Sequence, residues 1–403
     1  MASSQLLVCY GLLVLFNACF FVALSALPYV AKGVGMADLE LGYAQTAFNV
    51  LQLIGTPLVG VLVDRIGFRA TIAATFVSMG LSSAVLYNAE SAWSIAFSQL
   101  FGVMMVAQQS IQTAVAQLTK PGSERTNAFS RLGLCFGAGF VLTPIIAKAA
   151  TMAGGERTPL AAVALISFGV LPFIFAFAEN SKNPAEGSTA DKTESIKQKA
   201  SSESGWKLVL KDEKIRQLFV LKILLLSPAM LIFGSLQIFL MNKFAVDQAT
   251  NALVQLDIGL SIVFSNSFGI ALLRRRFNEE ELLYVGALTS IFCFAQFLWL
   301  EYLAQVWVGL FCLIFATTIA TSSADSLLSS SVQHEEQGLV LGISNSAISV
   351  VRTSAPTFAL WAVEEFGYGA LGWVGIFAAL AAIAYLRIAP MVAESRPLRS
   401  KEL

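Results

Sequence analysis

Charge is what this sequence has least of. Only 13% of its 403 residues are Asp, Glu, Lys or Arg, against about 25% in soluble domains, whereas 56% are hydrophobic. This composition excludes a soluble globular protein and indicates a chain that lies mostly inside a membrane. A bilayer core about 30 Å thick needs about 20 apolar residues per helix, so the chain has room for about a dozen spans.

Other absences exclude further classes of function. The 26 basic and 26 acidic residues balance, so we expect no nucleic-acid partner. The five cysteines are odd in number and lie in apolar runs, which argues against a disulfide framework or a metal site. The lone histidine, His334, falls in a polar loop. No nucleophile and base recur at catalytic spacing, so we expect no enzymatic activity and no cofactor. We expect a monomer.

Long apolar runs predict twelve membrane helices in two groups of six. The first run resembles a signal peptide but lacks a basic start and is long enough to span, so we expect it to be retained. The expected spans are residues 5–30, 42–63, 70–88, 92–117, 128–150, 159–178, 216–241, 252–273, 281–300, 304–330, 338–361 and 368–388.

A polar segment separates the two groups and fixes the expected topology. Residues 179–215 are rich in Ser, Lys, Glu and Ala and read as a linker between a bundle at 1–178 and a bundle with a short tail at 216–403. With an even number of spans, both termini and the linker share one side. That side holds 20 of the 26 basic residues and the opposite side four, which predicts a multi-pass protein with both termini in the cytosol.

The two groups echo each other. Gly60 and Gly269 precede equivalent loops, and Pro144 and Pro356 lie in equivalent helices, at nearly the same offset along the chain. This shared offset favours a six-helix duplication. The two prolines are expected to bend their helices.

The stretch "GVLVDRIGFR" places charge directly after the second span. It resembles the cytosolic signature of the major facilitator superfamily, through Gly60, Asp64, Arg65, Gly67 and Arg69. The resemblance implies that Asp64 meets the amino end of the eleventh helix and clamps the two halves when the cavity opens outward. It also implies that the arginines hold the loop and face lipid headgroups. The alternative is that these charges only set topology.

A narrower resemblance covers both halves. The stretches "LGYAQTAFNVLQLIGTPLVG", "ERTNAFSRLGLCFGAG" and "FNEEELL" are similar to those of the organic-cation-transporter-like solute carriers of family 22. The resemblance implies an all-α membrane fold of two pseudo-symmetric six-helix bundles and a solute such as an organic cation or lipophilic drug. Gln99 stands where proton-coupled relatives carry arginine, Leu273 stands where the first half has Asp64, and the antiporter signature of the fifth helix is only partly present. Its remaining positions are Gly139, Thr143, Pro144 and Ala147.

Polar residues inside the spans form stripes at helical spacing. Such residues usually face a cavity, although Ser, Thr and Asn also hold helices together. The expected cavity residues are Asn49, Gln52, Gln108, Gln112, Asn345 and Arg352.

Four charges are expected inside the membrane, all in the second half. Lys222 lies about 9 Å and Asp325 about 8 Å from the cytosolic ends of their helices, so the two are expected to pair. Asp257 and Arg352 match less closely in depth. For the pair Lys222 and Asp325 and for the pair Asp257 and Arg352, two interpretations stay open: a structural salt bridge, or a role in binding the solute or a proton.

These observations predict a secondary transporter that moves a small organic solute by rocking its two halves around a midplane site. Membrane lipid and the solute are the expected partners. Coupling to protons stays open, because Gln99, Leu273 and the partial antiporter signature depart from the pattern of proton-coupled relatives. The alternative is a membrane scaffold or receptor that keeps the fold without transporting.

Overall fold

The structure is a computed structural model that describes residues 2–119, 123–178, 212–332 and 337–388, and within these ranges it is helical. The first half contains α1 (Ala2–Gly33), α2 (Asp38–Ile66), α3 (Phe68–Tyr87), α4 (Ala92–Gln99), η1 (Leu100–Met104), α5 (Ala107–Leu118), α6 (Ser123–Gly154), α7 (Thr158–Gly169) and α8 (Leu171–Phe177). The second half contains α10 (Glu213–Phe244), α11 (Gln248–Phe264), η3 (Ser265–Gly269), α12 (Ile270–Leu273), α13 (Glu279–Gln296), η4 (Phe297–Trp299), α14 (Leu303–Ser330), α15 (Gln337–Phe366) and α16 (Gly369–Ile388).

Polar residues set where several helices begin. The Asp212 carboxylate accepts hydrogen bonds from the backbone N–H groups of Lys214 and Ile215, so α10 begins at Glu213 rather than at the expected 216. Asp247 caps α11 in the same way. At α13, the Glu281 side chain accepts from the backbone N–H of Asn278, as in a capping box.

Three expected spans are interrupted. The fourth consists of α4, the 3₁₀ turn η1 and α5, and the sixth consists of α7 and α8. In the eighth, the π-helical turn η3 separates α11 from α12. Prolines do not interrupt helices here, because α6 continues through Pro144 and α15 through Pro356. Whether they bend these helices stays a prediction.

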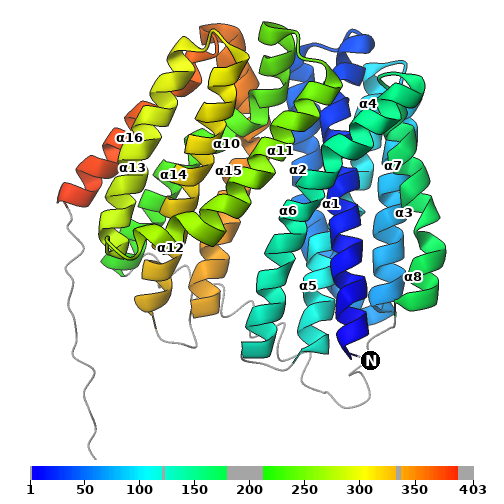
Figure 1. Ribbon diagram of the computed structural model, residues 1–403, viewed down its shortest axis with the longest axis horizontal. Helices are drawn as coiled ribbons and strands as arrows, with labels where there is room; N and C mark the ends of the chain where they lie inside the picture. The colour runs from blue at the N-terminus through cyan, green and yellow to red at the C-terminus, as the bar shows by residue number, and fades with distance from the viewer. Residues whose placement is uncertain (1, 120–122, 179–211, 333–336, 389–403) are drawn as a thin grey trace, which may run out of the picture.

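The helices form two bundles of six spans. Helices α1 to α8 lie on one side of Figure 1 and helices α10 to α16 on the other. Ten of the described helices are individually long and apolar enough to cross a membrane. The remaining two spans are the broken element α4–η1–α5 and the Ser- and Thr-rich α15, which complete the expected twelve.

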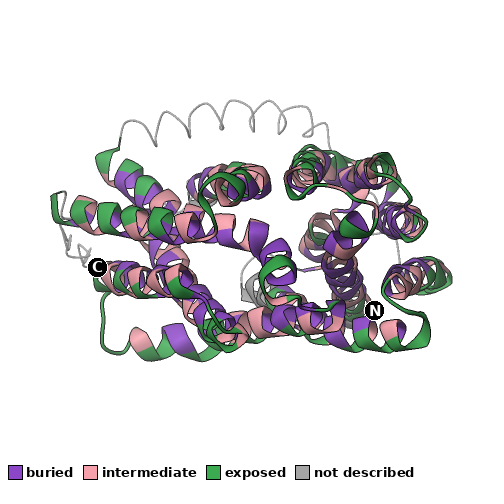
Figure 2. Cartoon of the chain, turned by 90° about the horizontal axis from the view of Figure 1, so that it is seen from above, coloured by how far each residue is buried: buried purple, intermediate pink, exposed green. Residues whose placement is uncertain are grey.

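The outer surface is apolar, as lipid requires. Large hydrophobic side chains lie exposed on the helices, among them Trp93, Leu165, Phe268 and Phe377. Viewed from above, buried positions cluster inside each bundle and exposed ones gather on its periphery (Figure 2). An exposed apolar belt of this kind would aggregate in water but is stable against acyl chains.

The two bundles meet near one end, which we call the closed end: the end at which α1 and α10 finish. The opposite end, where α1 and α10 begin, is the linker end. Helix α2 packs against α15, and α6 against α11. The hydrogen bonds that join described residues of the two halves lie near the closed end, at the top of Figure 1. They join Tyr29 to Val246, Thr46 to Thr357, Thr357 to Gly42, Asn242 to Asp38 and Asn251 to Ser25.

Gly42 allows a close approach of α2 to α15 in this contact. A Cβ atom on Gly42 would lie 2.8 Å from Leu360 Cδ1, 3.3 Å from the carbonyl oxygen of Pro356 and 3.4 Å from the Cα of Thr357. The backbone of α15 therefore occupies the space that a larger side chain on α2 would need.

We expect Gly42→Leu to wedge the closed end open without unfolding the protein, because the added atoms overlap α15 and the halves can separate. Spin labels at Glu40 and Glu365, both exposed at this end, should move apart in pulsed electron resonance measurements. Gly11→Leu is the matched control, since nothing lies within 4 Å of a Cβ at Gly11. An unchanged distance distribution in Gly42→Leu would contradict this account of the contact.

Candidate functional site

The charged signature forms the turn between α2 and α3. Gly67 adopts φ 87° and ψ 161°, a backbone conformation that side-chain-bearing residues rarely adopt, and its N–H donates to the carbonyl of Val63 at 3.0 Å. Arg69 Nε donates to the carbonyl oxygen of Ala178, after the last turn of α8. Gly67 therefore makes the turn possible, and Arg69 ties it to the end of the sixth span.

The expected clamp involves side chains that the structure does not describe. Asp64 lies in the last turn of α2, but its side chain is outside the described residues, as are the side chains at the start of α15. His334 is also outside the described residues. Arg65 is exposed. The clamp role of Asp64 stays a prediction.

The best-defined polar cluster in the described part of the membrane surrounds Lys222. Its Nζ donates to Asp325 Oδ1 at 2.6 Å, to Ser344 Oγ at 3.1 Å and to Asn345 Oδ1 at 3.1 Å. The three acceptors come from α14 and α15, and the lysine comes from α10. An ammonium has three donors, so each donor has a partner.

The two partners of this ion pair differ in exposure. The Lys222 side chain is 2% exposed and that of Asp325 is 33% exposed. Asn345 is exposed as well. The cation is thus enclosed by protein, whereas its carboxylate and amide partners form an accessible polar edge.

Arg352 and Asp257 do not pair with each other in the described structure. The Arg352 side chain, in the middle of α15, is exposed and has no hydrogen-bond or ion-pair partner among the described residues. Asp257 is half-buried on α11, and its Oδ2 is buried without a hydrogen-bond partner among the described residues. The depth match expected from the sequence therefore does not correspond to a contact here.

The amide residues divide into different roles. Gln52 Nε2 donates to the carbonyl of Met105 at 2.9 Å, and this carbonyl lies where the fourth span leaves α-helical geometry. Gln52 thus satisfies a backbone group that the broken helix leaves open, which is a structural role. Gln108 is exposed, and Asn49 and Gln112 are half-buried. Gln99 is buried and hydrogen-bonds the Ser98 hydroxyl.

Sequence reasoning missed two parts of this arrangement. Ser344 was not predicted as a cavity residue, although it directly precedes Asn345 and both accept hydrogen bonds from Lys222. At the linker end of the second half, Arg274 Nε pairs with Glu279 Oε1 at 2.9 Å and a second guanidinium nitrogen donates to Ser322. The Arg274 to Glu279 pair fastens the loop where the second half has Leu273 in place of an aspartate. The run "RRRFNEEE", in which three arginines are followed closely by three glutamates, could have indicated this ion pair.

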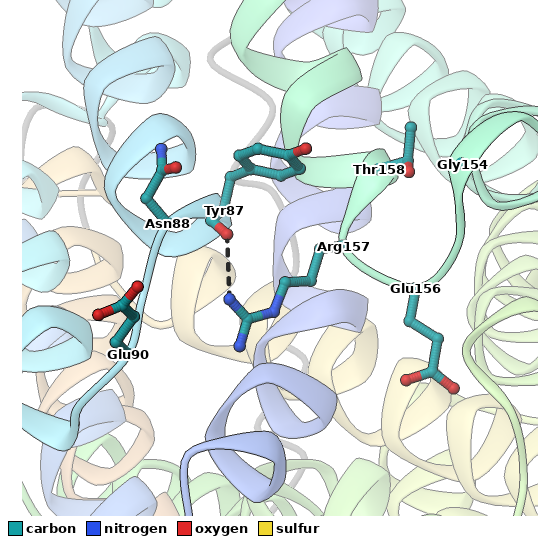
Figure 3. A pocket seen from close by; sticks show the side chains of 7 residues that line it. All are labelled: Tyr87, Asn88, Glu90, Gly154, Glu156, Arg157 and Thr158. Carbon is teal, nitrogen blue, oxygen red and sulfur yellow. Dashed lines mark hydrogen bonds between the residues drawn. The ribbon is translucent and has the colours of Figure 1, made fainter.

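A hollow of about 540 Å³ lies at the closed end of the first half (Figure 3). Arg157 extends across it and donates through Nη1 to the carbonyl of Tyr87 at 3.3 Å, between the carboxylates of Glu90 and Glu156. All of its lining residues belong to one half. The arginine ties the α6–α7 loop to the end of α3, so this hollow is not a site between the halves.

Comparisons with known proteins agree with this architecture. A family model described as Major Facilitator Superfamily matches residues 6–356. Human Solute carrier family 67 member A1 is 28% identical over 388 residues, covering 93% of this chain and 89% of that protein. Rat Solute carrier family 22 member 18 is 27% identical over 395 residues, covering 95% and 93%.

A solved structure extends the comparison to the fold. The crystal structure of the human organic anion transporter MFSD10 matches with a TM-score of 0.63 and 19% identity, covering 96% of this chain and 99% of that one. At that identity the match shows the fold. The expected twelve-helix fold and the resemblance to the organic-cation-transporter-like carriers are confirmed.

Removing either partner of the Lys222–Asp325 pair should destabilise the protein, but by different amounts. Asp325→Leu leaves an enclosed ammonium without its counter-ion and should lower stability by about 3–5 kcal/mol, as breaking a buried pair does. Lys222→Met leaves a carboxylate that is 33% exposed and should cost less. The double variant should recover most of the loss, because hydrophobic replacement of both partners is often nearly neutral. Thermal unfolding of the purified variants measures all three.

One outcome would contradict the pairing and another the expected difference between the single variants. Losses in the double variant equal to the sum of the single losses would mean that the residues do not interact. An equal loss in both single variants would mean that their difference in exposure has no energetic consequence. Ser326→Ala is a matched control on α14, since Ser326 bonds to Glu279 and not to Lys222.

Proposed function

Because the chain belongs to the major facilitator superfamily and is a secondary transporter of a small organic solute, we propose that its solute is an organic anion or zwitterion whose anionic group binds Arg352. The observation that carries this proposal is the state of the charges deep inside the second half: Lys222 and Asp325 are paired, whereas Arg352, in the middle of α15, is exposed and has no ion-pair partner among the described residues.

The depth of Arg352 supports a position in a water-filled space. It lies near the middle of α15, about 21–22 Å from each end of the helix. An arginine at the bilayer centre costs at least about 2.5–3.5 kcal/mol when it faces lipid, so such residues face a bundle interior or cavity. An exposed side chain at this depth is therefore best explained by the space between the two halves.

The remaining charges favour an anion or zwitterion over a bare cation. Lys222 and Asp325 neutralise each other, so the carboxylate of Asp325 is not free to attract an organic cation. The half-buried carboxylate of Asp257 offers an acceptor for an ammonium group of a zwitterion. The resemblance alone had pointed to organic cations, and this charge inventory is the reason to propose otherwise.

We also propose that the linker end faces the cytosol. The bias of basic residues toward that end supports this sidedness, because positively charged loops stay on the cytosolic side. The described conformation, which is joined at the closed end, would then be the one that opens to the cytosol. In this scheme the Asp64 clamp forms in the opposite conformation.

Proton coupling, where it occurs, is proposed to use Asp325 or Asp257. Gln99 stands where proton-coupled relatives have a charge, and the first half has no carboxylate in the middle of a described span. Protonation of Asp325 would remove its ion pair with Lys222 and leave the enclosed ammonium without its counter-ion. Proton binding would thereby be linked to the packing of α10 against α14.

Matched ligands test the proposed solute class. In thermal-shift measurements across triplets that share a skeleton, such as 3-phenylpropanoate, phenylalanine and 3-phenylpropylamine, the anion or zwitterion should stabilise the purified protein through Arg352, and any stabilisation by the amine should not depend on Arg352. Arg352→Gln should weaken binding by about 30-fold or more, because truncating one partner of a desolvated charge pair costs at least about 2 kcal/mol. Arg387→Gln, an exposed arginine at the end of α16, is the control. Stabilisation by the anion or zwitterion that is unchanged in Arg352→Gln would overturn the proposal.

The coupling proposal has its own measurement. In proteoliposomes with an imposed pH gradient, uptake of a solute identified by the thermal-shift experiment should lose its proton dependence in the Asp325→Asn and Asp257→Asn double variant. Exchange of labelled solute without a gradient should persist and shows that the protein is folded. Proton-driven uptake that survives the double substitution would exclude both carboxylates.

A further inference from the structure

A second pocket lies at the closed end, on the contact between the two halves. Its volume is about 510 Å³, within the range of small-molecule sites. One wall is Asp38 at the start of α2, and the other walls are the last turns of α10 and α15. Its lining residues are Asp38, Ser235, Ile238, Phe239, Asn242, Lys243, Leu360, Val363 and Glu364.

The charged residues of this pocket differ in whether they have a partner within the protein. Lys243 donates through Nζ to the carbonyl of Leu300 and lies 5.7 and 5.8 Å from the ring centroids of Phe239 and Phe244, so its charge is held by its own half. Asp38 and Glu364 are exposed, and neither has an ion-pair partner among the described residues. The lining therefore carries two carboxylates and one ammonium, a net charge of −1, and neither carboxylate is paired with that ammonium.

The floor of the pocket is apolar and ordered by packing. Ile238 is 2%, Leu360 3% and Phe239 7% exposed. The ring of Tyr368 stacks on Phe239 with centroids 3.5 Å apart, which fixes the aromatic surface. A ligand that fits both the floor and the rim carries a positive charge beside an apolar or aromatic group.

We propose that this pocket binds amphipathic organic cations, such as quaternary ammonium ions, at a site separate from the transported solute. The cation would lie between the carboxylates of Asp38 and Glu364, and its apolar part would lie against Ile238, Phe239 and Leu360. The carboxylates supply the attraction for the cation. Phe239 supplies apolar contact only, because Tyr368 stacks on its ring and Lys243 Nζ lies 5.7 Å from its centroid.

Binding at this site selects one conformation. Asp38 comes from the first half and the other walls come from the second, and Asn242 Nδ2 joins the walls by donating to Asp38 Oδ2 at 2.6 Å. Separation of the halves at this end takes the pocket apart. A ligand that binds only the joined state shifts the equilibrium toward it, so the cation acts as an inhibitor that is not transported.

Isothermal titration of the purified full-length protein with benzyltriethylammonium tests the site. We expect binding to weaken about two- to fivefold in Asp38→Asn and in Glu364→Gln, as for exposed ion pairs, and further in the double variant. Glu365→Gln is the matched control, because it is the neighbouring exposed carboxylate and does not line the pocket. Benzylsulfonate should not bind at this site.

Two further variants test conformational selection. Gly42→Leu, which should separate the closed end, should abolish benzyltriethylammonium binding. A disulfide between cysteines introduced at Thr46 and Thr357, whose hydroxyl oxygens are 2.7 Å apart, should preserve or tighten it. If Gly42→Leu, the wedge variant, fails to fold, the crosslinked protein still tests conformational selection, because it should bind at least as tightly as the unmodified protein.

The outcomes separate this site from the proposed solute site. Binding that is lost in Arg352→Gln but unchanged in the Asp38→Asn and Glu364→Gln double variant would place the cation in the transport pathway and overturn the inference. Binding that is equal in the crosslinked and wedge proteins would overturn conformational selection. Loss in the double variant with retention in Arg352→Gln is the expected result and does not depend on which solute is transported.

Discussion

The cost of taking a charge out of water governs where each of the four membrane charges lies. Lys222 is almost completely enclosed and has a partner for each of its three donors, including a carboxylate at 2.6 Å. Arg352 has no such partner among the described residues and is exposed at midmembrane depth. In the proposed scheme both arrangements avoid an unsolvated charge, Lys222 through protein groups and Arg352 through water between the halves. Lys222 would then hold the second bundle together, and Arg352 would be available to a solute.

The same constraint applies to the backbone wherever a helix is interrupted. The fourth span leaves α-helical geometry at η1, and the Gln52 amide on α2 satisfies the carbonyl of Met105. The turn after α2 needs the positive φ of Gly67, and Arg69 covers a carbonyl at the end of α8. In each case a polar side chain from a neighbouring span replaces the hydrogen bond that the helix cannot make. Gln52, which looks like a cavity residue in the sequence, therefore completes the backbone of a neighbouring span.

The predictable features are those set by local sequence. Apolar runs long enough to cross a bilayer define the spans, and matched depths on two helices were enough to anticipate the contact of Lys222 with Asp325. The break at η1 was not predictable, because it depends on the Gln52 side chain, which belongs to an earlier span. Asp257 and Arg352 show the limit of depth matching: helices at the same depth need not present their charges to each other. The pocket at Asp38 and Glu364 depends on segments near opposite ends of the chain, whose approach no local pattern encodes.

The contact between the halves is built from weak interactions, and this fits a protein that must open there. Its hydrogen bonds are between neutral groups except where Asn242 meets Asp38, and none of the ion pairs among the described residues joins the halves. Each such bond contributes about 0.5–1.5 kcal/mol net, and part of that is replaced by water on opening. The difference between the two conformations is then a few kcal/mol, a range that the binding of one small molecule can reverse. Breaking a buried ion pair on one side costs about 3–5 kcal/mol, so a contact between the halves without ion pairs among the described residues is easier to open in each cycle.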